Sequence, residues 1–262
     1  MKYDESFLFK RFARYSEYDK DYVGILFEYG YDAKELYDVL EENGLEHFGN
    51  KNLLSTMKNI MHYVSKKLYQ ADGNVKITIL KHFSVLTINE LIKLNKYKFS
   101  CWVYALYLAE CFLALGIPAR MIRCLSGLYL DNDCHCVTIA YCAEFDKYVL
   151  FDVANDVIFY SYDGIPLSLR ELRCYVLNNK RIFYVQSKQG EKNNLIKYWI
   201  KNLMIFQCFE IQKYGNELGI SYNKKNRSVF LMPKNLVMKK RTLPINKNYP
   251  IIITRNEDEF WR

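Results

Sequence analysis

Hydrophobic positions in the first part of the chain recur with the spacing of amphipathic helices. Between residues 53 and 69 the apolar side chains follow the period of about 3.6 residues that gives a helix one buried face. Segment 33–43 predicts an earlier helix, which Gly44 closes as a left-handed cap. Thr87 and Glu90 have the spacing of a capping box and predict a short helix that begins at about Ile88.

The next apolar segment has no polar face. Residues 101–115, CWVYALYLAECFLAL, are apolar on nearly every side, which predicts a helix buried inside the fold. Gly116 and Pro118 then end the helix.

Beyond this helix the pattern changes to short runs rich in β-branched and aromatic residues, separated by turn-type residues. The runs predict antiparallel strands over 119–127, 134–142 and 147–153. A turn and a helix follow over 163–173, an amphipathic helix over 193–203, and further strands at 204–212, 227–232 and 250–254. The order predicts an α+β fold in which the central helix packs on an antiparallel sheet behind a set of N-terminal helices.

Composition places the chain among ordered globular proteins. It has 262 residues, of which 50% are hydrophobic and 25% charged, enough apolar material for a sizeable core. The N-terminal residues lack the apolar stretch of a secretory signal, and no window has the roughly 18 apolar residues of a membrane span. We therefore expect a cytoplasmic protein whose eight cysteines are free thiols.

We expect three regions along the chain. Residues 1–85 form an N-terminal helical region, 86–175 the core that carries the chemistry, and 176–262 a helix and strands that complete the same domain. The nearest candidate boundaries are 71–86 and 187–192.

Positive charge is concentrated near the C-terminal end. The net charge is +8, and segment 218–256 has no acidic residue. Such a surface can attract an acidic protein partner, nucleic acid or anionic lipid, but no recognised nucleic-acid motif accompanies it. A solvated basic face is the simpler interpretation, and we expect neither nucleic acid nor membrane as a partner. The basic residues of the segment are Lys224, Lys225, Arg227, Lys234, Lys239, Lys240, Arg241, Lys247 and Arg255.

The candidate chemistry begins at Cys101. Ser100 can act as N-cap, which places Cys101 at the first helical position. The unpaired N–H groups and the positive end of the helix dipole there favour a thiolate, which is the nucleophilic form. Taken alone, however, a helical cysteine is more often a buried packing residue.

A nucleophilic thiolate needs a base, and the base needs an orienting group. Of the four histidines, only His135 begins a predicted strand, and Asp152 ends the next one. Adjacent antiparallel strands can bring these two side chains together, so that the carboxylate accepts the imidazole N–H and fixes its tautomer. The sequence therefore predicts a Cys101–His135–Asp152 triad.

These residues, with the segments around them, resemble the transglutaminase-like superfamily of papain-fold cysteine enzymes. The resemblance covers about residues 86–160, and segments 166–173 and 253–261 are also similar to uncharacterised bacterial members. Two departures concern the residues that follow the triad members: Val153 stands where members often have proline, and no tryptophan follows His135 closely. The matching segments are Ser100–Trp102, Leu115–Arg120, Asp133–Cys136 and Leu150–Asp152.

The resemblance implies a papain-like core and acyl transfer without a cofactor, a metal or calcium. Cys101 would attack a peptide or glutamine carboxamide to form a thioester, His135 would move the proton, and Asp152 would orient His135. Such an enzyme is a cysteine peptidase or a protein-glutamine acyltransferase, with hydrolysis the favoured outcome. The oxyanion would be bound by the Cys101 N–H and a side-chain donor, for which Asn95 is a weak candidate and Tyr97 and Trp102 are others.

Other interpretations of the same residues remain. A metal site is one interpretation of the cluster Cys134, His135 and Cys136. However, successive residues of a strand point to opposite faces, and zinc ligands usually have wider spacings. Asp156 is the second candidate for the orienting acid. The competing functional class is a catalytically silent protein-binding module of the same fold that uses the basic C-terminal surface. A nucleic-acid-associated protein, whose affinity would fall steeply with salt, is a third and weaker possibility.

Overall fold

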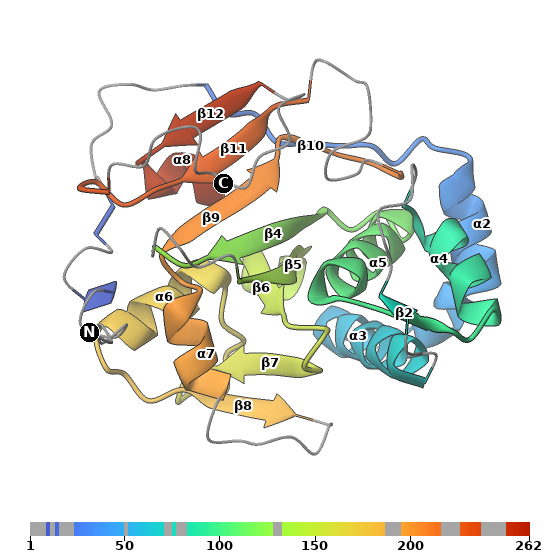
Figure 1. Ribbon diagram of the computed structural model, residues 1–262. Helices are drawn as coiled ribbons and strands as arrows, with labels where there is room; N and C mark the ends of the chain where they lie inside the picture. Colours follow the sequence, from blue (N-terminus) through green and yellow to red (C-terminus); the bar gives the residue numbers. More distant parts are fainter. Residues whose placement is uncertain are drawn as a thin grey trace.

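The computed structural model describes residues 9–10, 14–15, 24–49, 52–70, 75–76, 83–127, 133–186, 195–215, 226–236 and 250–262. Figure 1 shows a mixed fold of helices and sheet, with α2, α3 and α4 grouped around α5 and with α6 and α7 beside the β7–β8 pair. The N-terminal helices are α2 (Glu35–Glu42), α3 (Leu53–Gln70) and α4 (Val85–Lys93), with a 3₁₀ turn at Leu45–Phe48. The central helix α5 spans Cys101–Ala114.

The main sheet has six strands in the order β12-β11-β9-β4-β5-β6. Its neighbours pair antiparallel except for β11 and β12, which pair in parallel, so the expectation of an antiparallel sheet is wrong at this edge. Its strands are β4 (Ala119–Leu125), β5 (Cys134–Cys142), β6 (Lys147–Phe151), β9 (Ile205–Phe209), β11 (Ser228–Leu231) and β12 (Ile251–Thr254).

Short elements complete the described chain. Three two-stranded sheets pair β1 with β10, β2 with β3, and β7 with β8, none of which the sequence pattern predicted. Predicted strand 204–212 is divided into β9 and β10 at Glu210. The small strands are β1 (Glu28–Tyr29), β2 (Val75–Lys76), β3 (Tyr97–Lys98), β7 (Val157–Tyr160), β8 (Phe183–Gln186) and β10 (Ile211–Gln212), and the remaining helices are α6 (Leu169–Leu177), α7 (Leu195–Lys201) and α8 (Glu257–Trp261).

Helix ends follow their sequence signals with one exception. Gly44 has φ +57° and follows α2, as predicted for a left-handed cap. Helix α4, however, begins at Val85 rather than Ile88, so the predicted Thr87–Glu90 capping box is wrong. Ser84 caps the helix instead, because its side chain accepts the Thr87 N–H while the Thr87 hydroxyl accepts the Ser84 N–H at 2.8 Å.

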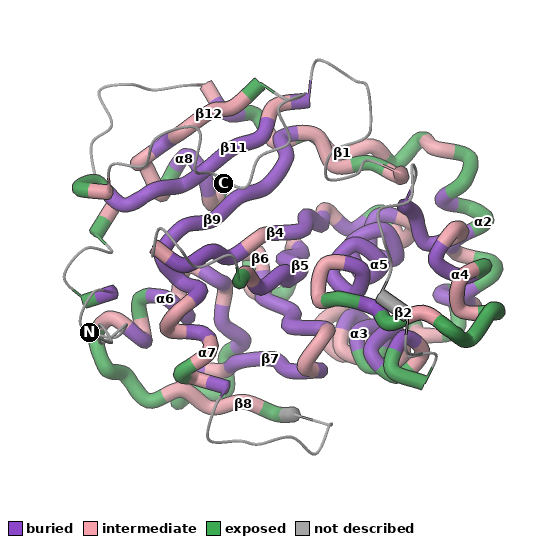
Figure 2. Tube along the Cα trace, in the orientation of Figure 1, coloured by how far each residue is buried: buried purple, intermediate pink, exposed green. Residues whose placement is uncertain are grey.

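Helix α5 is the centre of one half of the core. Eleven of its fourteen residues, Val103–Leu113, are buried, as the purple trace of Figure 2 shows. The Thr138 hydroxyl donates to the Ala105 carbonyl at 2.8 Å and thereby fastens the first turn and a half of α5 to strand β5. The apolar sequence of α5 thus places its N-terminus rigidly against the sheet.

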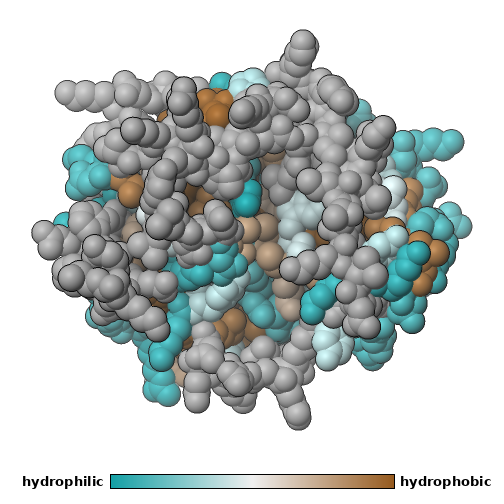
Figure 3. Space-filling view, in the orientation of Figure 1, coloured by the Kyte–Doolittle hydropathy of each residue, from teal (hydrophilic) through white to brown (hydrophobic). Residues whose placement is uncertain are grey.

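The alternation of side chains on β5 separates two apolar cores. Cys136 and Ala140 pack with the helices around α5, whereas Val137 and Ile139 pack with α6, α7, β9 and β11. Figure 3 shows hydrophilic residues with some hydrophobic ones among them on the side where α2 lies, and a hydrophobic patch beside hydrophilic residues in the middle of the visible face. In the described part of the chain, no helix combines the length and the apolar character that crossing a membrane requires.

Two candidate domain boundaries cannot be compared with the fold. Segment 187–192 lies outside the described residues, as does most of 71–86. The three-region division therefore stays a prediction.

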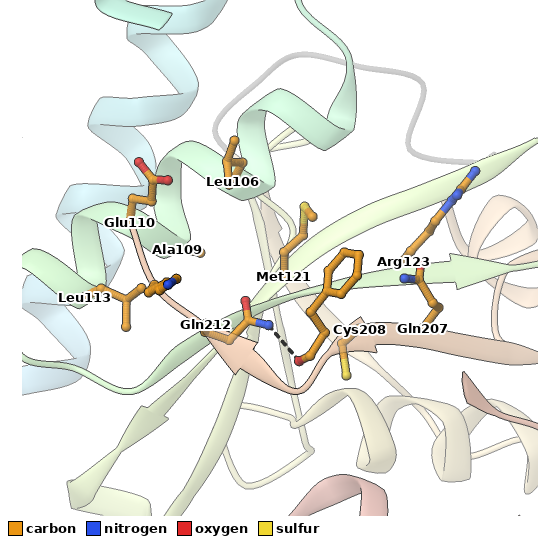
Figure 4. A pocket seen from close by; sticks show the side chains of 11 residues that line it. Leu106, Ala109, Glu110, Leu113, Met121, Arg123, Gln207, Cys208 and Gln212 are labelled. Atoms are coloured by element: carbon orange, nitrogen blue, oxygen red, sulfur yellow. Dashed lines mark hydrogen bonds between the residues drawn. The ribbon is translucent and has the colours of Figure 1, made fainter. Parts of the chain in front are cut away.

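A buried carboxylate ties α5 to two other segments. Glu110 is 1% exposed, and its carboxylate accepts the Val85 N–H at 2.8 Å and the Gly215 N–H at 3.0 Å. Burial raises the pKa of Glu110 to about 8, although the two backbone donors oppose the shift. Glu110 also lines a small pocket between α5, β4 and β9, which contains none of Cys101, His135 and Asp152 (Figure 4).

Glu110 predicts a pH-dependent stability. Its pKa is higher in the folded state than in the unfolded chain, so the folded state retains a proton that the unfolded state releases. The free energy of unfolding should therefore fall as the pH rises from about 4.5 to about 8, by at most about 1.4 kcal/mol per pH unit from this group. Urea denaturation between pH 5 and pH 8 should show a shallower dependence for Glu110→Gln than for the wild type.

The control is Glu46→Gln, because the Glu46 side chain is 61% exposed. This variant should keep the wild-type dependence. Parallel curves for the wild type and Glu110→Gln would show that Glu110 does not retain its proton in the folded state.

Candidate active site

Cys101 is the first residue of α5, as predicted. Ser100 is the N-cap residue with extended backbone, as predicted, but its side chain accepts no capping hydrogen bond within the described chain. The helix instead begins through the Ser100 carbonyl, which accepts the Val103 N–H at 2.9 Å. The first two N–H groups of a helix, here those of Cys101 and Trp102, have no acceptor within the helix, which suits them to bind negative charge.

His135 and Asp152 meet because of the register between β5 and β6. Thr138 pairs with Phe151, so Asp152 follows the last paired residue of β6 and lies toward the beginning of β5. The Nε2 atom of His135 lies 2.9 Å from Oδ1 of Asp152. Since an ionised carboxylate only accepts hydrogen bonds, Nε2 carries the proton, and Nδ1 is the imidazole atom left to exchange a proton with Cys101.

The Asp152 carboxylate is fully buried and has further donors. Its Oδ2 atom accepts the Asn155 side-chain amide at 2.8 Å and the Trp199 indole N–H at 3.2 Å. Asn155 comes from the turn that follows β6, and Trp199 comes from α7. The carboxylate is thus held in one orientation by three side chains, which keeps Oδ1 directed at His135.

Electrostatics favour a charged pair at Cys101 and His135. A hydrogen bond from the Cys136 thiol is the largest cause that lowers the pKa of Cys101 to about 4; burial opposes it, and the hydrogen bond and charge of His135 add to it. Burial also disfavours the imidazolium, but the charge and hydrogen bond of Asp152, with a contribution from Cys101, raise the pKa of His135 to about 10. Between these two pKa values the stable form is a thiolate facing an imidazolium.

Two aromatic rings of α7 enclose the imidazole. The rings of Tyr198 and Trp199 each lie 5.2 Å from His135, centroid to centroid, and nearly edge-on at 72° and 87°. The Tyr198 hydroxyl lies 3.5 Å from the Cys134 carbonyl oxygen, and the Cys101 sulfur lies 3.9 Å from the same oxygen. The phenol of Tyr198 thus contacts the imidazole and shares an acceptor, the Cys134 carbonyl, with the Cys101 thiol.

Sequence reasoning missed Asn155, Tyr198 and Trp199. It interpreted segment 193–203 only as an amphipathic helix that covers the sheet. The signal that could have found Asn155 is its position three residues after Asp152, where Asx-type side-chain bonds are common. Nothing in the local sequence distinguishes Tyr198 or Trp199 from packing residues.

The second candidate for the orienting acid faces another partner. Asp156 is buried with φ +53°, and its Oδ2 atom lies 2.7 Å from Nδ1 of His62 on α3. Asp152 alone of the two contacts His135, so the Asp156 alternative is wrong.

The candidate oxyanion donors have different surroundings. Asn95 is exposed and has φ +48°. It lies two residues after the end of α4, where its N–H donates to the Ile92 carbonyl and closes the last turn of the helix. The Trp102 ring packs against Phe83 with 4.6 Å between centroids, and its buried indole N–H has no acceptor in the described part of the chain. Tyr97 lies in the short strand β3.

The two cysteines next to His135 have different surroundings, since Cys134 packs against the core that contains α6 and α7 and Cys136 lies in the other core. Cys136 lies in the core around α5, whereas His135 contacts α7, as the strand alternation predicts. Among the described residues, no group of three metal-ligating side chains is arranged to hold a metal ion.

Most of the basic segment 218–256 lies outside the described residues, which omit 216–225 and 237–249. Of its described residues, Arg227 forms an ion pair with Glu210 and donates to the Gly24 carbonyl at 3.1 Å. Arg227 therefore supports the fold, and the expected acidic partner stays a prediction.

Comparison with known proteins adds little to this geometry. No protein-family model matches the chain. No curated protein is similar to it. Among solved structures, the chain is similar to one described as "a Putative Cysteine Protease from Cytophaga hutchinsonii", with 15% sequence identity and a TM-score of 0.33. The similarity covers 70% of this chain and 63% of that one, and at this level the function has to be argued from the residues themselves.

Proposed function

We propose that the protein is a cysteine hydrolase of the transglutaminase-like, papain-fold kind, which cleaves amide bonds through a thioester on Cys101. The observation that carries the proposal is the arrangement at the start of α5. Cys101 lies at a helix N-terminus beside His135, and the Nε2 atom of His135 is bound to the buried carboxylate of Asp152 at 2.9 Å. Nucleophile, base and orienting group thus stand in the order that acyl transfer requires.

The first half of the reaction uses the pair in its charged form. The Cys101 thiolate attacks the carbonyl carbon of a peptide or glutamine carboxamide, and the carbonyl oxygen becomes an oxyanion. The unpaired N–H groups at the start of α5 supply hydrogen bonds to this oxyanion. The C–N bond then breaks, and Nδ1 of His135 donates its proton to the departing amine, which leaves a thioester and a neutral imidazole.

The second half reverses the proton transfer. Neutral His135 accepts a proton from water, whose oxygen attacks the thioester and releases a carboxylic acid and the Cys101 thiolate. An amine in place of water would give amide exchange. Hydrolysis is the favoured outcome, and the nature of the released product distinguishes the two.

The test of the nucleophile is the pH dependence of Cys101 alkylation, followed by peptide mass spectrometry on the native protein. An ordinary thiol titrates near pH 8.5. Cys101 should react at its full rate at about pH 6, because its pKa is lowered to about 4. His135→Ala should move the reaction toward higher pH, because the imidazolium that stabilises the thiolate is lost.

The remaining seven cysteines serve as internal references. Cys174 is exposed, whereas Cys134 has a pKa lowered to about 6 by the Cys136 thiol and should react after Cys101 on an ascending pH series. If Cys101 reacts slowly at every pH, the proposed chemistry fails. The catalytically silent binding module then becomes the better interpretation.

The hydrogen bond from Trp199 to Asp152 leads us to expect that Trp199 helps to position the triad, and the alkylation rate of Cys101 can test this. Trp199→Phe keeps the ring in place but removes the donor to Oδ2 of Asp152, a hydrogen bond to a charged group worth about 1.5–3 kcal/mol. We expect a several-fold slower alkylation of Cys101 at pH 5, and a larger loss for Asp152→Asn, since the amide no longer stabilises the imidazolium.

Trp261→Phe is the matched control, because the buried indole N–H of Trp261 has no acceptor among the described residues. Equal effects of the two tryptophan variants would mean that Trp199 acts through packing alone.

The reaction type is tested with a glutamine-containing protein in the presence and absence of a fluorescent primary amine. New carboxyl termini indicate a peptidase, ammonia release indicates deamidation, and incorporation of the amine indicates exchange. Each activity should be lost in Cys101→Ala while the variant still unfolds cooperatively, because the half-buried thiol makes only a small packing contribution.

A further inference from the structure

Three free thiols gather where α5 meets the beginning of β5. Cys101 belongs to α5, and Cys134 and Cys136 share one face of β5 because they are two residues apart. The Cys101 sulfur lies 3.9 Å from the Cys134 carbonyl oxygen, Cys101 packs against the apolar core that contains Cys136, and both of the other thiols act on the pKa of Cys136. Cys136 is therefore the central member of the group and the direct neighbour of the proposed nucleophile.

The three thiols differ in access to solvent. Cys101 and Cys134 are partly exposed, whereas Cys136 is 1% exposed. An oxidant from solvent thus reaches Cys101 directly, but reaches Cys136 only through the site. Stabilised thiolates with access to solvent are the cysteines that peroxides oxidise first.

We propose that Cys136 is a resolving thiol, which captures peroxide-oxidised Cys101 as a Cys101–Cys136 disulfide and so gives the site a reversible inactive form. The inference rests on the proposed function in one respect, namely that Cys101 is the activated nucleophile.

The chemistry balances with a hydroperoxide as the oxidant. The Cys101 thiolate attacks one peroxide oxygen, the O–O bond breaks, and hydroxide leaves, so that Cys101 becomes a sulfenic acid. The Cys136 sulfur then attacks the Cys101 sulfur, the S–O bond breaks, and the oxygen leaves as water with the Cys136 proton. With hydrogen peroxide, two thiols give one disulfide and the peroxide is reduced to two waters.

The position of Cys136 favours capture over further oxidation. A sulfenic acid that persists in contact with solvent is oxidised irreversibly to sulfinic and sulfonic acids. Here the second thiol packs in the same core as the first and is shielded from solvent, so no diffusion step precedes the S–S bond. Reduction starts from the partly exposed sulfur of Cys101, to which an external thiol has access.

The experiment is peroxide treatment of the native wild-type protein, followed by alkylation under denaturing conditions and mass spectrometry. We expect the protein to lose two hydrogen atoms, with Cys101 and Cys136 protected from alkylation and found in one cross-linked peptide pair. Dithiothreitol should restore full alkylation of both. A disulfide between Cys101 and Cys134, or sulfinic and sulfonic acid on wild-type Cys101 without a disulfide, would overturn the proposal.

Cys136→Ser and Cys134→Ser form a matched pair of variants. With Cys136→Ser, a sulfenic-acid trapping reagent should label Cys101, and prolonged peroxide treatment should make the oxidation resistant to dithiothreitol. With Cys134→Ser, the Cys101–Cys136 disulfide should form as in the wild type. The wild-type measurement stands without either variant if one of them fails to fold.

The outcomes separate this inference from the proposed function. If Cys101 is alkylated rapidly near pH 6 but forms no disulfide with Cys136, only the inference fails. If Cys101 reacts with neither the alkylating reagent nor peroxide, the activated nucleophile is absent and both fail.

Discussion

The fully buried carboxylate of Asp152 is the constraint on which the candidate site depends. A carboxylate removed from water is costly unless donors replace its hydration. Here the donors come from three places in the chain: His135 on β5, Asn155 in the turn after β6, and Trp199 on α7. Satisfying this one group therefore fixes the imidazole, orders the turn and attaches α7 to the sheet.

The orientation of the thiol depends on packing rather than on polar contacts. Helix α5 has no polar face, so its only stable place is between the sheet and α2, α3 and α4. Its N-terminus therefore has one position relative to β5, reinforced by the bond from Thr138 to Ala105. The hydrophobic core thus places Cys101 next to His135, and the hydrogen bonds of Asp152 fix the orientation of the His135 imidazole.

Sequence reasoning succeeded where the signal is local. The period of apolar residues located α3, the nearly uninterrupted apolar run located α5, Gly44 marked the end of α2, and the turn-separated runs located β4, β5 and β6. It failed where a partner is distant in the chain. The parallel pairing of β11 with β12 and the antiparallel pairing of β7 with β8 depend on which segments meet in space, and no residue pattern within a strand records that choice.

The residues of the candidate site fall into the same two groups, those with a local sequence signal and those without one. The candidates Cys101, His135 and Asp152 were proposed from their element ends and spacing together with a family resemblance. Tyr198 and Trp199 were not, because an aromatic residue on the apolar face of a helix has the same appearance in sequence whether it packs or donates a hydrogen bond. The capping box of α4 shows that a short-range signal can also be ambiguous. Ser84 and Glu90 are both three residues from Thr87, and only the backbone conformation decides which of them pairs with Thr87.

Because side chains alternate along β5, the pairing register of this strand decides on which face of the sheet each functional group lies. Successive residues of one strand supply an imidazole to α7 and a thiol to α5, so the two kinds of chemistry are kept apart by a single peptide unit. A shift of one residue relative to β4 and β6 would exchange the two faces and put the imidazole into the apolar core. An inserted or deleted codon is therefore more damaging in this strand than substitution of most of its residues, because it moves the side chains on one side of the change to the wrong face of the sheet together.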